Sequence, residues 1–341
     1  MTETDDFLVV DGLGKEFRLK QGGMLRAVHD VSFRQRRGET LGIVGESGCG
    51  KSTLARMILH LTPPSRGEVI VGGDTLSALT PAALRRKRRD MQMIFQDPNA
   101  SLDPRMRVDA LIEEPLVIHG LGDRATRARR VAELLDLVGL PAEAARRFPH
   151  EFSGGQRQRI SIARALAVEP ALVVADEPVS ALDVSIQAQI LNLLVGIRER
   201  FGLTYVFISH DLAVVRHISD RVAVMYLGEI VETGEAEAFF AGPLHPYAQM
   251  LLAAVLEAGE TPEAAQVAGE PPDPQSPPPG CTFHPRCPFM MERCQREAPP
   301  ETRIDGRRVR CWLHQEGQGA PPPAPPLGPQ APLLKRMDCK G

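Results

Sequence analysis

The sequence predicts an α/β fold over residues 1–256, with a mostly parallel sheet covered by helices. Short runs of apolar and β-branched residues alternate with helical patterns, which is typical of such a sheet. These strand candidates are 41–44, 68–71, 171–175, 204–209 and 221–226. Two segments also repeat apolar residues at helical spacing, 124–138 before Gly139 and about 186–200.

The composition excludes several classes of protein. Hydrophobic residues make up 43% and charged residues 24% of the 341 residues, which is typical of globular chains. The formal net charge is −3, so nothing favours a general nucleic-acid binder, and we interpret the basic run at 85–89 as a solvated helix face. No apolar run approaches the ~20 residues that cross a bilayer, and the acidic start does not resemble a signal peptide. We therefore expect a cytoplasmic chain that reaches a membrane through a partner.

Composition shifts divide the rest of the chain. Residues 257–280 read as a Pro-rich linker, and 281–314 hold four cysteines and little core of their own. Residues 315–341 are too rich in proline and too poor in apolar residues to pack, so we expect them to be disordered.

A phosphate-binding loop is the first chemical signal. GESGCGKST at 45–53 matches G-x-x-x-x-G-K-[ST], and it lies between the strand candidate 41–44 and a helical pattern, as the motif requires. Its glycines let backbone N–H groups point at phosphate oxygens. We expect Lys51 to reach the β- and γ-phosphates and Ser52 to supply its hydroxyl to Mg²⁺. The nucleotide-binding candidates in the loop are Gly45, Glu46, Ser47, Gly48, Cys49, Gly50, Lys51, Ser52 and Thr53.

An apolar strand that ends in two carboxylates is the second signal. In ALVVADEP at 171–178, we expect Asp176 to lie beside Mg²⁺ and Glu177 to polarise the attacking water. The alternative is an acidic turn after a strand, which is common in α/β folds. The phosphate-binding loop favours the metal-linked interpretation.

A serine and two glycines before a helical pattern are the third signal. In FSGGQRQR at 152–159, Ser153 and Gln156 have the spacing of a capping box, so one interpretation is a simple helix start. Such a start is also an anion site. Here the chain resembles the ATP-binding cassette (ABC) ATPases, whose signature is LSGGQ, with Phe152 in place of the leucine.

The other motifs of the ABC family follow in order. Gln96 in IFQDP resembles the Q-loop, Asp183 in SALD the D-loop and His210 in ISHD the switch histidine. Phe17 in KEFRL is a candidate for stacking on adenine. The resemblance implies a RecA-like core with a helical subdomain at about 97–165.

The resemblance also implies a composite site, because two cassettes of this family pair head to tail around ATP. The residues that would act on one nucleotide are Lys51, Ser52, Gln96, Asp176, Glu177 and His210, with Ser52, Gln96 and Asp176 around Mg²⁺. The residues that would cap the nucleotide of the other cassette are Ser153, Gly154, Gly155 and Gln156. We expect Glu177, His210, Lys51 and Gln96 to be the catalytic residues.

Three longer stretches resemble the ATPases of oligopeptide/dipeptide importers, and fit the F-type subunit best. They are GESGCGKSTLAR, FQDPNASLDPRMRV and HPYAQMLLAAV. The resemblance implies an ATP-hydrolysing subunit on the cytoplasmic face of the bacterial inner membrane. Its partners would be a D-type second cassette, two transmembrane permease subunits and, indirectly, a periplasmic or surface solute-binding protein. Related importers carry nickel, opines, glutathione or sugars, and a non-transport ABC ATPase or a metal- or redox-sensing adaptor is a more remote alternative.

Four cysteines follow the linker with the spacing C-x5-C-x6-C-x16-C: Cys281, Cys287, Cys294 and Cys311. Disulfides are disfavoured in the cytoplasm, and four thiolates suit zinc or an iron–sulfur cluster. Zinc sites favour C-x2-4-C pairs, which this segment lacks. Its resemblance to the C-terminal region of the peptide-importer ATPases implies a structural 4Fe–4S cluster, with zinc as the alternative. We interpret His284 and His314 as turn residues.

Overall fold

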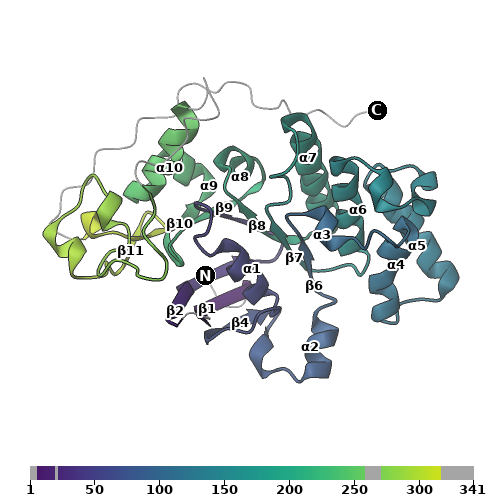
Figure 1. Cartoon of the computed structure of the whole chain (residues 1–341), viewed down its shortest axis with the longest axis horizontal. Coiled ribbons are helices and arrows are strands. Elements are labelled where there is room, and N and C mark those ends of the chain that lie inside the picture. The colour runs from purple at the N-terminus through teal and green to yellow at the C-terminus, as the bar shows by residue number, and fades with distance from the viewer. Residues whose placement is uncertain (1–5, 20–21, 258–269, 316–341) are drawn as a thin grey trace. The chain divides into compact units, whose positions relative to one another are not determined.

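The structure is a computed structural model that describes residues 6–19, 22–257 and 270–315. The chain divides into two compact units, residues 1–230 and 231–341 (Figure 1). Half of the predicted linker 257–280, and all but the first residue of the predicted disordered tail, lie outside the described residues. No helix among the described residues is long and apolar enough to cross a membrane.

The first unit contains the predicted parallel sheet, in the strand order β9-β3-β8-β7-β6. Neighbouring strands in this run pair in parallel. Every residue of β3, β7 and β8 is buried, which explains their continuous apolar runs. The strands are β3 (Thr40–Val44), β6 (Met91–Ile94), β7 (Leu172–Asp176), β8 (Thr204–Ser209) and β9 (Arg221–Tyr226).

A second sheet in this unit is antiparallel, with the order β2-β1-β4-β5. One of the predicted strands, 68–71, belongs here, so its assignment to the parallel sheet was wrong. After α1 the chain returns through residues 59–65, and β4 then pairs with β1 rather than with β3. The strands are β1 (Asp6–Arg18), β2 (Met24–Arg36), β4 (Arg66–Val71) and β5 (Asp74–Thr75).

Both predicted helices form. They are α5 (Arg124–Leu137) and α7 (Val184–Phe201). Asp123 begins α5, because its carboxylate accepts a hydrogen bond from the Thr126 N–H at 2.8 Å. Gly202, with φ of 62°, ends α7 in the left-handed conformation that glycine favours. The helices α1 (Lys51–Ile58) and α8 (Leu212–Ile218) pack against the parallel sheet.

A group of helices fills the chain between β6 and β7, and Figure 1 shows α3, α4, α5 and α6 gathered on one side of the first unit. They are α3 (Pro98–Ser101), α4 (Val108–Ile118), α5, and α6 (Gly154–Leu166), with 3-10 turns η2 (Ala142–Arg146) and η3 (Pro149–Glu151). The basic run at 85–89 begins on the short helix α2 (Pro81–Lys87), which follows η1 (Leu76–Ala78).

The described residues of the second unit form three antiparallel strands and two α-helices. The strand order is β11-β12-β10, and the first two residues of β10 precede the boundary of the unit. The elements are β10 (Glu229–Glu235), α9 (Ala236–Ala241), α10 (Pro246–Glu257), η4 (His284–Arg286), η5 (Glu292–Gln295), β11 (Glu301–Ile304), β12 (Arg307–Arg310) and η6 (Trp312–His314).

A buried carboxylate on β10 holds the turn that precedes α10. Glu232 accepts hydrogen bonds from the N–H groups of Leu244, at 3.0 Å, and His245, at 2.7 Å. The rings of His245 and Tyr247 then pack 5.7 and 5.4 Å from the Phe283 ring in the cysteine segment. Burial raises the pKa of Glu232 to about 7 and lowers the pKa of His245 to about 3.

This buried carboxyl makes stability depend on pH. Between the ordinary pKa of 4.5 and about 7, the folded chain keeps a proton on Glu232 that the unfolded chain has lost. The free energy of unfolding therefore falls as pH rises through this window, by up to about 3 kcal/mol. We expect Glu232→Gln to flatten the slope, measured by urea unfolding between pH 4.5 and 8. The exposed Glu235→Gln is the control, and an unchanged slope in Glu232→Gln would contradict the assignment.

Candidate active site

The phosphate-binding loop forms between β3 and α1, as predicted. Its backbone approaches other chain segments too closely for side chains: a Cβ at Gly45 would lie 2.1 Å from the Met225 carbonyl oxygen, and one at Gly50 would lie 2.2 Å from that of Ala27. The Lys51 ammonium donates to the carbonyl oxygens of Gly45 and Glu46, at 2.7 and 2.8 Å. The loop therefore curls around the buried Lys51 amine.

Ser52 and Asp176 meet beside this loop. The Ser52 hydroxyl at the start of α1 donates to Oδ1 of Asp176 at the end of β7, over 3.0 Å. Burial raises the pKa of Asp176, the Ser52 hydrogen bond opposes that rise, and the charge of Glu177 adds to it. Hydroxyl and carboxylate oxygens are the ligands that Mg²⁺ takes, so the donor set fits this ion.

Glu177 contacts two other predicted site residues, Gln96 and His210. Its Oε2 accepts a hydrogen bond from the Gln96 amide at 3.2 Å and lies 3.1 Å from Nδ1 of His210. These residues follow β6, β7 and β8, which are neighbours in the parallel sheet. The carboxyl ends of parallel strands meet at one edge, which is where ligands bind in such sheets.

The backbone at Glu177 adopts a conformation that side-chain-bearing residues rarely take. Its φ is 46°, and its N–H donates to the Ile208 carbonyl oxygen on β8 at 2.9 Å. Such strain costs of order 1–3 kcal/mol and is found most often at functional sites. The carboxylate is thereby turned to meet both Gln96 and His210.

The signature forms the N-terminus of α6. Ser153 and Gln156 make both bonds of a capping box, at 3.0 and 3.3 Å, so the capping interpretation is confirmed. A Cβ at Gly155 would lie 2.4 Å from the Ile186 side chain, so α6 and α7 pack closely there. Asp183 begins α7, and Gly154 follows Ser153 in the first turn of α6.

Phe17 lies near the end of β1, an inner strand of the antiparallel sheet, and pairs with Leu25 of β2. Its side chain is 37% exposed, and the Lys15 ammonium lies 5.2 Å from the ring centroid. The ring is therefore accessible to a planar ligand, and its role toward adenine stays a prediction.

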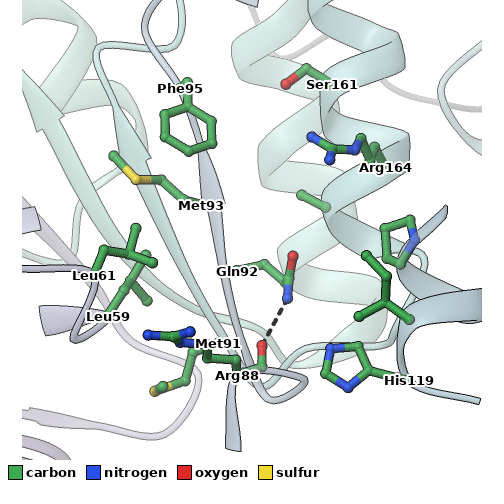
Figure 2. A pocket seen from close by; sticks show the side chains of 13 residues that line it. Leu59, Leu61, Arg88, Met91, Gln92, Met93, Phe95, His119, Ser161 and Arg164 are labelled. Carbon is green, nitrogen blue, oxygen red and sulfur yellow. Dashed lines mark hydrogen bonds between the residues drawn. The ribbon is translucent and has the colours of Figure 1, made fainter. Parts of the chain in front are cut away.

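A surface pocket that the sequence did not reveal adjoins the Gln96 loop. It measures about 250 Å³, and Figure 2 shows Met93 and Phe95 on one side and Ser161 and Arg164 on a helix on the other. The Gln92 amide in its wall donates to the Arg88 carbonyl oxygen at 2.8 Å (Figure 2). The remaining lining residues are Leu59, Leu61, Met91, Pro115, Ile118, His119 and Ala165. Met93 and Phe95, two apolar residues just before Gln96, were the only sequence features that could have indicated this pocket.

The four cysteines of the second unit line one small cavity. Phe283, Trp312 and His245 also line it, and the cysteines are Cys281, Cys287, Cys294 and Cys311. Burial raises the pKa values of the Cys287 thiol and, to about 12, the Cys311 thiol. Yet no three His, Cys, Asp or Glu side chains among the described residues form a group that could hold a metal ion. In this structure the four thiols therefore do not form the ligand group that the predicted 4Fe–4S cluster, or its zinc alternative, would need.

The two histidines of this segment bond to backbone. His284 Nδ1 donates to the Cys281 carbonyl oxygen and His314 Nε2 to that of Leu244, both over 2.9 Å. These bonds agree with their interpretation as turn residues.

Together, the loop around Lys51, the Ser52–Asp176 pair and the carboxylate of Glu177 define a phosphate-binding-loop nucleotide hydrolase. The comparisons with known proteins narrow this class. Residues 28–180 match the family model described as ABC transporter, and residues 231–294 match the oligopeptide/dipeptide transporter, C-terminal region.

Relatives extend along almost the whole chain. The probable peptide ABC transporter ATP-binding protein y4tS of Sinorhizobium fredii is 48% identical over 96% of this chain and 94% of its own. The oligopeptide transport ATP-binding protein AppF of Bacillus subtilis is 51% identical over 81% of this chain and 86% of its own. The structure also resembles a dimeric post-hydrolysis state of the ATP-binding cassette MJ0796 bound to ADP and Pi. The TM-score is 0.62 at 31% identity, covering 67% of this chain and 98% of that one.

This chain belongs to the ATP-binding subunits of the oligopeptide/dipeptide ABC transporter family. It is an ABC-type ATPase with the fold of that family, as the motifs predicted.

Proposed function

We propose that this chain is the F-type ATPase subunit of an importer that carries dipeptides or oligopeptides across the bacterial cytoplasmic membrane. The observation that carries the solute class is the match of residues 231–294 to the C-terminal region of oligopeptide/dipeptide transporters. The peptide-transport names of y4tS and AppF support it. The chain would act from the cytoplasmic face, bound to two permease subunits and served by a solute-binding protein.

ATP hydrolysis would use the residues at the edge of the parallel sheet. Lys51 would bind the β- and γ-phosphates, and Ser52, Asp176 and Gln96 would hold Mg²⁺, which when bound neutralises charge that develops on the phosphates. Glu177 orients the attacking water and accepts its proton, because its carboxylate is the base at this edge. His210 hydrogen-bonds the γ-phosphate and, through its 3.1 Å contact, holds the Glu177 carboxylate in place.

A second cassette would complete the site. Ser153 and Gln156 make their capping hydrogen bonds to each other, within the first turn of α6. The backbone N–H groups of the two signature glycines would bind the phosphate of a nucleotide that another cassette holds. The dimeric MJ0796 cassette with ADP and Pi supports this arrangement. The γ-phosphate gains donors from both cassettes when they close, so ATP favours the closed state and its hydrolysis releases it. We propose a D-type cassette as the partner in a heterodimer.

The proposal is tested by ATP-driven uptake into vesicles that carry the assembled transporter. We expect labelled dipeptides or oligopeptides to be imported and Glu177→Gln to lower hydrolysis about a hundredfold or more while ATP still binds and the closed dimer accumulates. Undiminished hydrolysis in the variant would contradict the role of Glu177. Uptake of nickel, an opine, glutathione or a sugar in place of peptides would overturn the solute class.

A matched variant keeps this test specific. The Glu169 side chain is 70% exposed and pairs with Arg130 on the surface. Glu169→Gln removes the same charge away from the nucleotide, so hydrolysis and uptake should stay at the parental level.

The permease would dock in the pocket beside Gln96. The Gln96 loop directly follows Phe95 in the pocket wall, so a change at one is carried to the other through the adjacent backbone. The wall is mostly apolar, with polar groups from Arg88, Gln92, His119, Ser161 and Arg164, which suits the apolar face of an amphipathic helix.

Two neighbouring residues on α4 test this docking site. Ile118 lines the pocket and Val117 does not, although their side chains are 50% and 54% exposed. We expect Ile118→Asp to reduce co-purification with the permease, because a desolvated charge would face the docked segment, and Val117→Asp to leave it intact. Equal behaviour of the two variants would exclude the pocket as the docking site.

We also propose that the four-cysteine segment carries a structural 4Fe–4S cluster. The support is the sulfur donor set, since thiolates are the usual ligands of such clusters, and the cavity that the four side chains share. The sulfur atoms would have to draw together to form a ligand group.

Metal analysis of protein purified without oxygen tests the cluster. We expect about four irons with matching sulfide and a brown colour, both lost in Cys287→Ser while ATP binding persists. Cys49→Ser, in the phosphate-binding loop and outside this segment, is the control for metal content alone and should keep the iron, sulfide and colour. One zinc without colour would replace the cluster by a zinc site, and the absence of any metal would overturn both.

A further inference from the structure

An arginine that the ATP chemistry above does not use holds the turn before α6. Arg147 lies between η2 and η3, and its Cζ is 4.5 Å from the centroid of the Phe152 ring. Its Nη2 donates to the Glu151 carbonyl oxygen, and its Nε lies 3.4 Å from Glu151 Oε1. The guanidinium therefore contacts both residues that lead directly into Ser153.

Phe152 is the position at which this signature differs from LSGGQ. Its side chain is 5% exposed, and its backbone leads into the Ser153 cap of α6. A guanidinium stacks on the face of an aromatic ring, whereas leucine offers no such face. The stacking contact therefore requires both Arg147 and Phe152, and a leucine at position 152 would remove it.

The same turn is tied to the rest of the helical group. The Arg147 carbonyl oxygen accepts a hydrogen bond from the Val108 N–H, the first residue of α4, at 3.0 Å. Glu151 Oε2 accepts one from the Phe148 N–H at 2.7 Å. The backbone of Arg147 is therefore hydrogen-bonded to the start of α4, while its side chain contacts Glu151 and Phe152 next to the signature.

We propose that Arg147 is a positioning residue for the signature: stacked on Phe152 and bonded to Glu151, it fixes the direction in which the N-terminus of α6 meets the ATP of the other cassette. The proposal rests on the composite site described above. Orientation, rather than charge, is the contribution, because the carboxylate of Glu151 balances the guanidinium locally. The Lys variant keeps the charge but loses the planar stack and the fork of donors.

Steady-state ATP hydrolysis by the assembled transporter tests the proposal. We expect Arg147→Met to raise the KM for ATP about three- to tenfold with little change in kcat, because saturating ATP still closes the dimer. Arg147→Lys should restore little of the loss. A purely structural role would instead lower kcat through loss of folded protein and leave KM unchanged.

A double-mutant cycle identifies the contact. If the stack on Phe152 carries the effect, Arg147→Met should change KM much less in a Phe152→Leu background than in the parent. The exposed neighbour Arg146→Met is the control and should keep the parental KM. Additive effects of the two substitutions, or an unchanged KM in Arg147→Met, would overturn the inference. Failure of the unmodified transporter to hydrolyse ATP would instead overturn the proposed function on which it rests.

Discussion

One carboxylate oxygen, Oε2 of Glu177, is the point on which the candidate active site depends. Gln96 donates to it from the loop after β6, and His210 contacts it from the loop after β8. The parallel register sets this geometry, because Ile94 pairs with Ala175 and Asp176 pairs with Ile208 in adjacent strands. The left-handed backbone at Glu177 then turns the carboxylate toward both partners.

The two groups of residues proposed to act on ATP lie on different parts of the first unit. Lys51, Ser52 and Asp176 gather at the edge of the parallel sheet, whereas Ser153 caps α6 in the helical group. The sheet would supply a rigid base for the phosphates, and the helical group presents a glycine-rich helix start. In the proposed dimer, the N-terminus of α6 in each cassette would contact the ATP bound by the other. A permease segment docked in the pocket beside Gln96 would then move when the two cassettes close.

The sequence predicted the features that rest on continuous local patterns. The buried strands β3, β7 and β8 and the loop around Lys51 formed as expected, because their motifs carry their own structural context. The segment 68–71 pairs with β1 in the antiparallel sheet. An apolar run predicts a strand but does not show which strand it pairs with. Bulges such as the one between Val10 and Leu13 interrupt β1, so its alternation is irregular and the sequence did not indicate it.

Side-chain contacts whose geometry is set by turns were also not predicted from the sequence. The stack of Arg147 on Phe152 and the Glu232 hydrogen bonds to the turn before α10 depend on backbone directions that no spacing rule contains. The cysteine spacing indicated a shared site, and the four side chains do line one cavity. The spacing of cysteines in the sequence does not set the distances between their sulfur atoms. It therefore could not predict whether a metal binds there, or which one.

The most direct test of the central claim is a structure of the assembled transporter with the Glu177→Gln substitution, ATP and Mg²⁺. We expect ATP on the Lys51 loop to be covered by the partner cassette, and Ser153, Gly154 and Gly155 to contact the nucleotide that the partner holds. Glutamine at position 177 should still lie between Gln96 and His210. Nucleotide bound by one cassette alone, with both signatures facing solvent at saturating ATP, would contradict the account.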